Sequence, residues 1–165
     1  MSSQQESPAV AIARAHVEAW ANHDFDTARS MLTDDVKVIS TSTDPALPQT
    51  DLTGAGHYME GLIAYAQPIV PGSLNILGGT GDERNALLTL TVKMAGGPFG
   101  AGVTAPCARL YLLDEHDKIK AEHVIFYLRR TDQARAGQRH PAPLGTARMP
   151  RAPRGASRCT TPRWR

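Results

Sequence analysis

The stretch VEAWANHDFDTARSMLTDDVKV, at residues 17–38, decides the fold. Its first residues complete a helical pattern that ends at Trp20 and Ala21, and three polar residues at 22–24 then interrupt that pattern. Asp24 belongs to a residue type that caps helices, which predicts a second, short helix running through Leu32. The turn at residues 33–35 leads directly into an alternating strand over 35–41. The stretch therefore predicts two helices and a strand in immediate succession.

The remaining elements follow from the same periodicities on either side of this stretch. Upstream, Ser7 and Pro8 suit the start of a helix whose apolar positions recur as far as Ala21. Downstream, a proline-containing loop over 43–53 precedes a third helix over 55–67, which Pro68 ends. Strand patterns then cover 73–78, 86–94, 103–113 and 120–128. This order predicts an α+β domain with helices on one side of a curved sheet.

Two parts of the chain carry a family resemblance: residues 17–38 and the last hairpin, ARLYLLDEHDKIKAEHVIFYL at 108–128. With the order of elements, they resemble the nuclear transport factor 2-like superfamily in its SnoaL-like branch, which contains polyketide cyclases and ketosteroid isomerases. The resemblance covers residues 9–128, with Asp117 where the family usually has glycine. It implies a cone-shaped, curved antiparallel sheet packed against three helices from the N-terminal half, an architecture also called cystatin-like. It further implies a pocket for a small apolar ligand, and we expect a homodimer built through the outer sheet face.

Charge divides the chain into two unlike parts. Residues 1–128 carry 8 Lys or Arg against 15 Asp or Glu, whereas residues 129–165 carry 10 Arg, no Lys and one acid. The second part is rich in Pro, Ala and Gly and has no apolar periodicity, which predicts a disordered tail after a domain at 9–128. Residues 1–8 are predicted to be a disordered N-terminus. Such a tail could hold nucleic acid through phosphate contacts, or it could be passive or even non-native sequence from a shifted reading frame.

Composition argues against several classes of protein. The N-terminus lacks the basic start and apolar run of a signal peptide, and no apolar run is long enough to span a bilayer. We therefore expect a cytoplasmic protein without membrane contact. Cys107 and Cys159 have no companion ligands, so neither a disulfide framework nor a metal site is expected. The Gly-rich run at 78–82 precedes a strand rather than a helix, which argues against a phosphate cradle. No cofactor is expected.

The last hairpin supplies the first candidate for catalysis. A symmetric turn at 114–118 would set Arg109 opposite His123, and alternation would then gather one face from Cys107, Arg109, Tyr111, His123, Ile125 and Tyr127. The cation would lower the pKa of His123 and keep it available as a base or acid, with Arg109 as its electrostatic partner and Tyr111 as an orienting donor. Alternatively, Arg109 and His123 lie on the outer face. A register shift of one residue would separate the pair.

His16 is the second candidate, because it borders the apolar stripe of the first helix, one turn before Trp20. By the resemblance, it falls where ketosteroid isomerases carry a tyrosine that donates to the substrate oxyanion, and an imidazole can donate there too. The alternative is a buried histidine without a catalytic role. The predicted ligand contacts are Trp20, Tyr58, Tyr65, Ile125 and Tyr127, although aromatic residues at helical spacing also fill cores.

The carboxylates of the family's known enzymes are missing from their expected positions. The isomerase base would fall at Ser40 and its protonated partner at Arg109, which argues against classical ketosteroid isomerase activity. Asp44 and Glu122 stay open as substitute bases, but Glu122 has the wrong parity if His123 faces the pocket. The Asp-Arg-Asp set of limonene epoxide hydrolase would fall near Thr89, Thr91 and Val124.

The sequence thus predicts a cofactor-free isomerase, cyclase or dehydratase, the last being a lyase. It would apply acid/base chemistry to a small, largely apolar substrate in the cone. The alternative is a non-catalytic ligand-binding or dimerisation module of the same fold, which the missing carboxylates favour. Fold-level resemblance does not name the substrate.

Overall fold

Three helices and six strands make up the part of the chain that is described in a computed structural model, residues 6–43, 49–96 and 100–127. The helices are α1 (Pro8–Ala21), α2 (Phe25–Ser30) and α3 (Ala55–Ala66). The strands are β1 (Leu32–Ser42), β2 (Thr50–Thr53), β3 (Asn75–Gly81), β4 (Asn85–Lys93), β5 (Thr104–Leu113) and β6 (Ile119–Phe126). The predicted helices and strands are all present. Only β2 was not predicted, because it lies in a segment whose prolines indicated a loop.

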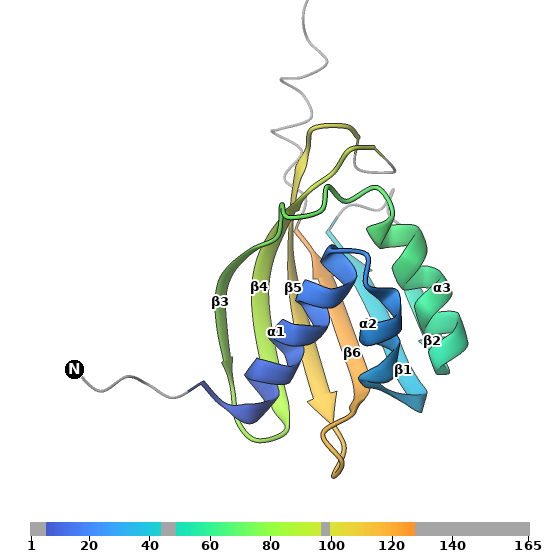
Figure 1. The fold of residues 1–165 in the computed structure, drawn as a ribbon, viewed down its shortest axis with the longest axis vertical. Helices are drawn as coiled ribbons and strands as arrows, with labels where there is room; N and C mark the ends of the chain where they lie inside the picture. The colour runs from blue at the N-terminus through green and yellow to red at the C-terminus, as the bar shows by residue number, and fades with distance from the viewer. Residues whose placement is uncertain (1–5, 44–48, 97–99, 128–165) are drawn as a thin grey trace, which may run out of the picture. The chain divides into compact units, whose positions relative to one another are not determined.

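The strands form one curved sheet in the order β2-β1-β6-β5-β4-β3, and the helices lie on one side of it (Figure 1). Four of the five strand pairs are antiparallel, whereas β1 and β6 are parallel. The predicted antiparallel sheet is thus a mixed one. The parallel pair arises because the chain leaves β1 and returns beside it only after α3 and the meander from β3 to β6. The α+β class with a curved sheet is confirmed.

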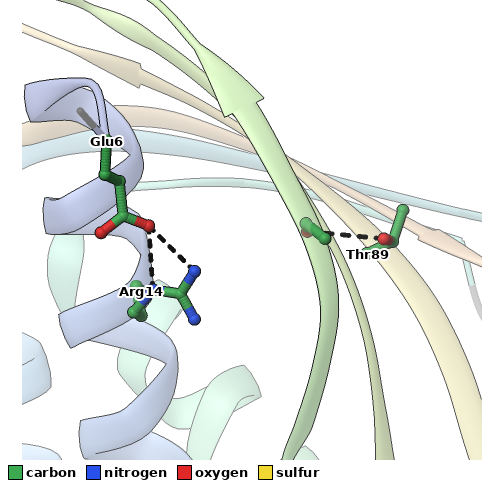
Figure 2. A network of polar contacts seen from close by, with 4 residues as sticks. Glu6, Arg14 and Thr89 are labelled. Carbon is green, nitrogen blue, oxygen red and sulfur yellow. Dashed lines mark hydrogen bonds and ion pairs between the residues drawn. The ribbon is translucent and has the colours of Figure 1, made fainter. Parts of the chain in front are cut away.

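The first helix begins at Pro8, after Ser7 in extended conformation, and lies across the sheet. Its outer face carries Arg14, whose guanidinium holds the Glu6 carboxylate at 2.9 Å (Figure 2). Its inner face buries a row of side chains: Ala9, Val10, Ala13, His16, Val17, Trp20 and Ala21. Glycine at position 79 permits this approach, since a Cβ there would lie 3.0 Å from Cγ1 of Val10. His16 lies in this buried row.

The polar break after α1 starts the second helix as predicted. The Asp24 side chain accepts a hydrogen bond from the backbone N–H of Thr27 at 3.1 Å, which caps α2. His23 has a φ of 64° and turns the chain between the two helices. The second helix ends at Ser30, two residues earlier than predicted, because Leu32 already begins β1.

The turn between β5 and β6 is built around two aspartates. Oδ1 of Asp114 accepts hydrogen bonds from the backbone N–H groups of His116, at 2.9 Å, and Lys118, at 2.8 Å. Asp117 adopts a φ of 60°, in the left-handed region that favours glycine. Aspartate is among the few other residues that tolerate this region, so the turn can form here without a glycine.

A β-bulge follows this turn and changes the hairpin. Leu113 pairs with Ile119, as predicted, but Leu112 pairs with Ala121, so Lys120 is an extra residue on β6. An extra residue moves every later pair by one position and exchanges the two faces of the strand. The predicted register beyond the turn is therefore wrong. The site depends on this shift.

The bulge exchanges the places of two neighbouring titratable residues. His123 pairs with Leu110 on the outer face rather than with Arg109, and Leu110 is 45% exposed. Glu122 takes the inward place opposite Tyr111 and is 3% exposed. The inner face of the hairpin thus carries a carboxylate where the symmetric register placed a histidine on that face.

Three predictions about the rest of the chain lie partly or wholly outside the described residues. They concern the N-terminal segment 1–8, of which 1–5 are not described, the tail 129–165 and the loop residue Asp44. Within the described residues, none of the helices is long and apolar enough to cross a membrane.

Candidate functional site

A cavity of about 360 Å³ lies between α3 and the strands β1, β2, β5 and β6. Most of its wall is apolar, since α3 and β2 contribute Leu52, Leu62 and Ala64, and the sheet contributes Val38, Val124 and Phe126. Gly61 on α3 also lines it, and a Cβ there would lie 3.3 Å from the Leu52 side chain. The absence of a side chain at this position therefore keeps part of the cavity open. A volume near the lower end of the usual range for ligand sites suits a small molecule.

One polar part of the cavity wall is a cluster of three buried side chains, called here the polar floor: Tyr58, Arg109 and Glu122. Oε1 of Glu122 accepts a hydrogen bond from Nη1 of Arg109 at 2.5 Å. Oε2 of the same carboxylate accepts a short hydrogen bond from the Tyr58 hydroxyl. The two side chains of the ion pair are 2% and 1% exposed, so water screens this pair very little. Both oxygens of the carboxylate are bound before any ligand arrives.

Aromatic rings hold the guanidinium of Arg109 in place. Its central carbon lies 4.3 Å from the ring centroid of Trp20 and 5.4 Å from that of Tyr65. A cation over the face of an aromatic ring is attracted by the ring quadrupole, and more strongly where water is excluded. Trp20 comes from α1 and Tyr65 from α3, so two helices fix a residue that the sheet supplies. Nε of Arg109 has no hydrogen-bond partner among the described residues.

The electrostatics of the polar floor fix which of its groups is charged. Burial alone would raise the pKa of Glu122, but the Arg109 charge, with smaller contributions from His16 and the Tyr58 hydroxyl, lowers it below its ordinary value. Burial, together with the neighbouring Glu122 charge, raises the pKa of Tyr58 well above its ordinary value. Burial also acts to lower the pKa of Arg109, but Glu122 together with Tyr111, Cys107 and Tyr65 outweighs burial, so that this pKa is raised well above its ordinary value. At neutral pH the floor therefore holds a carboxylate, a guanidinium and a neutral phenol.

His16 and Tyr111 lie behind the polar floor. The Tyr111 hydroxyl is 3.4 Å from Nδ1 of His16, and Tyr111 stands directly opposite Glu122 on the neighbouring strand. Burial lowers the pKa of His16 to about 4, an effect that Arg109 reinforces and Glu122 opposes. The imidazole is therefore neutral at neutral pH. Its Nε2 has no partner among the described residues.

A second polar group lines the cavity where β1 and β2 meet. The hydroxyls of Ser40 and Thr50 are 2.7 Å apart, and the backbone N–H of Thr50 donates to Oγ of Ser40 at 3.0 Å. By the sequence resemblance, Ser40 is expected to fall where ketosteroid isomerases carry their base. It pairs with Val124, two residues beyond Glu122 on β6. In this cavity wall the carboxylate therefore comes from β6, whereas β1 contributes a hydroxyl.

Six of the nine predicted site residues lie in or directly around the cavity. Tyr58, Tyr65 and Arg109 line it; Trp20 packs on Arg109, and His16 and Tyr111 lie behind the floor. The structure does not bring the other three to it. His123 is half-buried on the outer face, where its Nε2 lies 3.1 Å from the Thr41 hydroxyl. Ile125 shares that face by alternation, and Tyr127 is 46% exposed beyond the end of β6.

The symmetric register predicts that Glu122, which stays open as a substitute base, points away from the pocket. The structure instead places Glu122 in the cavity wall. The only sequence signal for its true position is the apolar pattern of β6, because Val124 and Phe126 alternate inward with Glu122. Thr89, one of the positions compared with the epoxide hydrolase set, is exposed and does not line the cavity. Its hydroxyl donates to the Gly78 carbonyl of β3 (Figure 2).

Comparison with known proteins gives a family and a set of folds. The family model of the SnoaL-like domain matches residues 13–122. A limonene-epoxide-hydrolase-like enzyme from Mycobacterium tuberculosis is 21% identical, with 72% of this chain and 82% of that chain covered and a TM-score of 0.53. A proposed SnoaL-like polyketide cyclase from Shewanella putrefaciens is 14% identical, with coverage of 75% and 82% and a TM-score of 0.61. A cystatin-like protein from Silicibacter pomeroyi is 18% identical, with coverage of 76% and 79% and a TM-score of 0.59. No curated protein matches the chain.

Proposed function

Because the chain belongs to the SnoaL-like domain family, whose fold hosts several small-molecule chemistries, we propose that it is a cofactor-free isomerase, cyclase or dehydratase acting on a small, largely apolar carbonyl compound. One observation carries the proposal: an ionised, buried carboxylate, Glu122, lies beside two hydrogen-bond donors in the wall of an apolar cavity. A base next to donors is the arrangement that removal of a proton from carbon requires.

In the proposed reaction, Glu122 removes a proton from the carbon next to the carbonyl group. The electron pair of the broken C–H bond moves to the carbonyl oxygen, which becomes an enolate oxygen. Protonation weakens Glu122 as an acceptor, so the Tyr58 hydroxyl, which its raised pKa keeps protonated, moves its hydrogen bond from Glu122 to this oxygen. Arg109 donates a second hydrogen bond to the same oxygen. The proton then returns to another carbon in an isomerisation, or to a leaving hydroxyl group in a dehydration. In a cyclisation, the enolate carbon attacks a second carbonyl group of the substrate, the enolate oxygen becomes a carbonyl oxygen again, and the new alkoxide takes the proton back from Glu122.

His16 and Tyr111 act as positioning residues in this proposal. Both lie behind Glu122, and neither is among the residues that line the cavity. A neutral imidazole fixes the Tyr111 hydroxyl, and Tyr111 stands against the carboxylate from the opposite strand. The role that the sequence analysis assigned to His123 passes to Glu122, because only Glu122 reaches the cavity.

The proposal is tested by proton exchange, which requires no knowledge of the final product. Wild-type protein in D₂O is expected to place deuterium next to the carbonyl group of at least one ketone in an apolar panel, as measured by mass spectrometry. Glu122→Gln is expected to lower that rate by about 10²–10⁴-fold, because the amide cannot accept the proton. Tyr58→Phe is expected to lower it by about 10²-fold through loss of one oxyanion donor.

Glu60→Gln is the matched control, since Glu60 is an exposed carboxylate on α3, away from the cavity. It is expected to leave the exchange rate unchanged. Circular dichroism verifies that each variant is folded. Exchange by folded Glu122→Gln at the wild-type rate would contradict the assignment of the base.

A non-catalytic ligand-binding module is the second candidate function. The observation that favours it is that each oxygen of Glu122 already accepts a hydrogen bond from the protein, which makes the carboxylate a weaker base. This candidate predicts that a ketone binds to the cavity but exchanges no deuterium.

We also propose that the protein is a homodimer through the outer sheet face and resides in the cytoplasm. The outer face supports the dimer because it exposes large apolar side chains, with Ile39 and Leu110 each 45% exposed on strands β1 and β5. Half-buried His123 and Ile125 lie on the same face. Binding of nucleic acid through the tail at 129–165 stays a prediction from sequence.

A further inference from the structure

The titratable groups around the cavity carry no net charge. From the sheet, Arg109 contributes one positive charge and Glu122 one negative charge. The other titratable side chains that face this cluster come from α1, α3 and β5, and all are neutral at neutral pH: His16, Tyr58, Tyr65, Cys107 and Tyr111. Among the described residues, no further Asp, Glu, Lys or Arg lines the cavity.

The ion pair is also held so that neither partner can offer an unshared charge to a ligand. Arg109 is stacked against the ring of Trp20 from α1 and also lies over that of Tyr65 from α3. Glu122 is held on one oxygen by Arg109 and on the other by Tyr58. An anionic ligand would have to share Arg109 with a carboxylate already in contact with it. A cationic ligand would have to share Glu122 with the guanidinium.

We propose that the cavity accepts only ligands without a formal charge and that Glu122 is the residue that excludes anions. An apolar wall offers a charged ligand no replacement for lost water, and a buried charge without a partner is strongly unfavourable. The ligand class is therefore a neutral molecule with one hydrogen-bonding group, such as a ketone, an aldehyde or an alcohol on an apolar body. Free carboxylates, phosphates and protonated amines are excluded. This inference rests on the proposed function only in that the cavity binds the ligand.

The same reasoning predicts that one substitution reverses the selectivity. Glu122→Gln removes the negative charge, keeps an acceptor for the Tyr58 hydroxyl, and leaves Arg109 buried without a counterion. A carboxylate ligand can then supply the missing charge, because a guanidinium pairs well with a carboxylate. The double variant Arg109→Gln with Glu122→Gln has neither charge, so it gives a carboxylate no such partner.

The experiment compares three probes that share one apolar body. Acetylnaphthalene is a neutral ketone, naphthoate an anion and naphthylmethylammonium a cation, and binding of each to the full-length chain is measured by titration calorimetry at neutral pH. Wild-type protein is expected to bind the ketone at least about 30-fold more tightly than either ion, since an unpaired buried charge costs several kcal/mol. Glu122→Gln is expected to prefer naphthoate to the ketone. The double variant is expected to prefer the ketone again.

Two results would overturn the inference. One is wild-type protein that binds either ion as tightly as the ketone or shows no preference among the three probes. The other is folded Glu122→Gln that gains no affinity for naphthoate relative to the ketone. If Glu122→Gln does not fold, the wild-type comparison alone decides. A preference for the neutral probe without deuterium exchange would contradict the catalytic proposal and support this inference. Deuterium exchange without a preference for the neutral probe would support the catalytic proposal and contradict this inference.

Discussion

Arg109→Met is expected to lower the free energy of unfolding by about 3–5 kcal/mol, because it leaves the Glu122 carboxylate buried without its counterion. Methionine keeps an unbranched, apolar side chain against Trp20, so most of the packing there remains. The loss therefore reports chiefly the unpaired charge. Urea denaturation at neutral pH measures it.

The double variant Arg109→Met with Glu122→Gln separates charge from packing. It removes both charges and leaves the Tyr58 hydroxyl an acceptor, so it is expected to recover most of the stability that the single variant loses. Arg29→Met is the matched control, because Arg29 pairs with Asp34 at the surface, with the two side chains 42% and 99% exposed. That substitution is expected to change stability by less than about 1 kcal/mol. If Arg109→Met lowered the free energy of unfolding no more than Arg29→Met does, this would contradict a polar floor in which Arg109 and Glu122 form an ion pair away from water.

The wild-type protein is expected to lose about 3 kcal/mol of stability on acidification from pH 6.5 to pH 4, on account of His16 alone. Burial lowers the pKa of His16 from 6.5 in the unfolded chain to about 4 in the folded protein. Between these values the unfolded state binds a proton that the folded state does not, so acid favours unfolding. This contribution is complete above pH 6.5, falls through the window and is lost below pH 4.

The variant His16→Gln is expected to flatten this part of the stability curve, whatever its effect on stability at neutral pH. Chemical denaturation at half-unit pH intervals gives the slope. The window from 6.5 to 4.5 is the informative one, because Glu122, whose pKa is lowered from 4.5, contributes only below it. His116→Gln, at an exposed histidine in the turn after β5, is expected to keep the wild-type slope. If the free energy of unfolding changed with pH equally in wild type and His16→Gln, this would contradict a buried His16 that stays neutral in the folded protein.

Local sequence signals predicted most of the elements, because those signals act through neighbouring residues. Pro8 at the start of α1 and the Asp24 cap of α2 need no distant partner to exert their effect. The short strand β2 was not predicted, because its four residues have no strong strand pattern and form a strand by pairing with β1. The parallel pairing of β1 with β6 is likewise a consequence of the whole topology.

The candidate site was predicted only as far as it did not depend on the hairpin register. Arg109 and Tyr111 precede the bulge and keep the faces they were assigned, and His16 is placed by helical periodicity. Beyond Lys120 every face is exchanged, so the predicted histidine became an outer residue and Glu122 became the carboxylate of the floor. A bulge of one residue leaves almost no trace in the composition of a strand, yet it decides which titratable group reaches the cavity.

A crystal structure of the protein saturated with acetylnaphthalene would test the central claim, that the polar floor binds and acts on the polar group of the ligand. We expect the carbonyl oxygen within about 2.6–3.2 Å of the Tyr58 hydroxyl or the Arg109 guanidinium. We also expect the methyl carbon next to the carbonyl to lie about 3–3.5 Å from a carboxylate oxygen of Glu122. A ligand that placed its carbonyl group at Ser40 and Thr50, with its apolar rings against Glu122, would contradict the account.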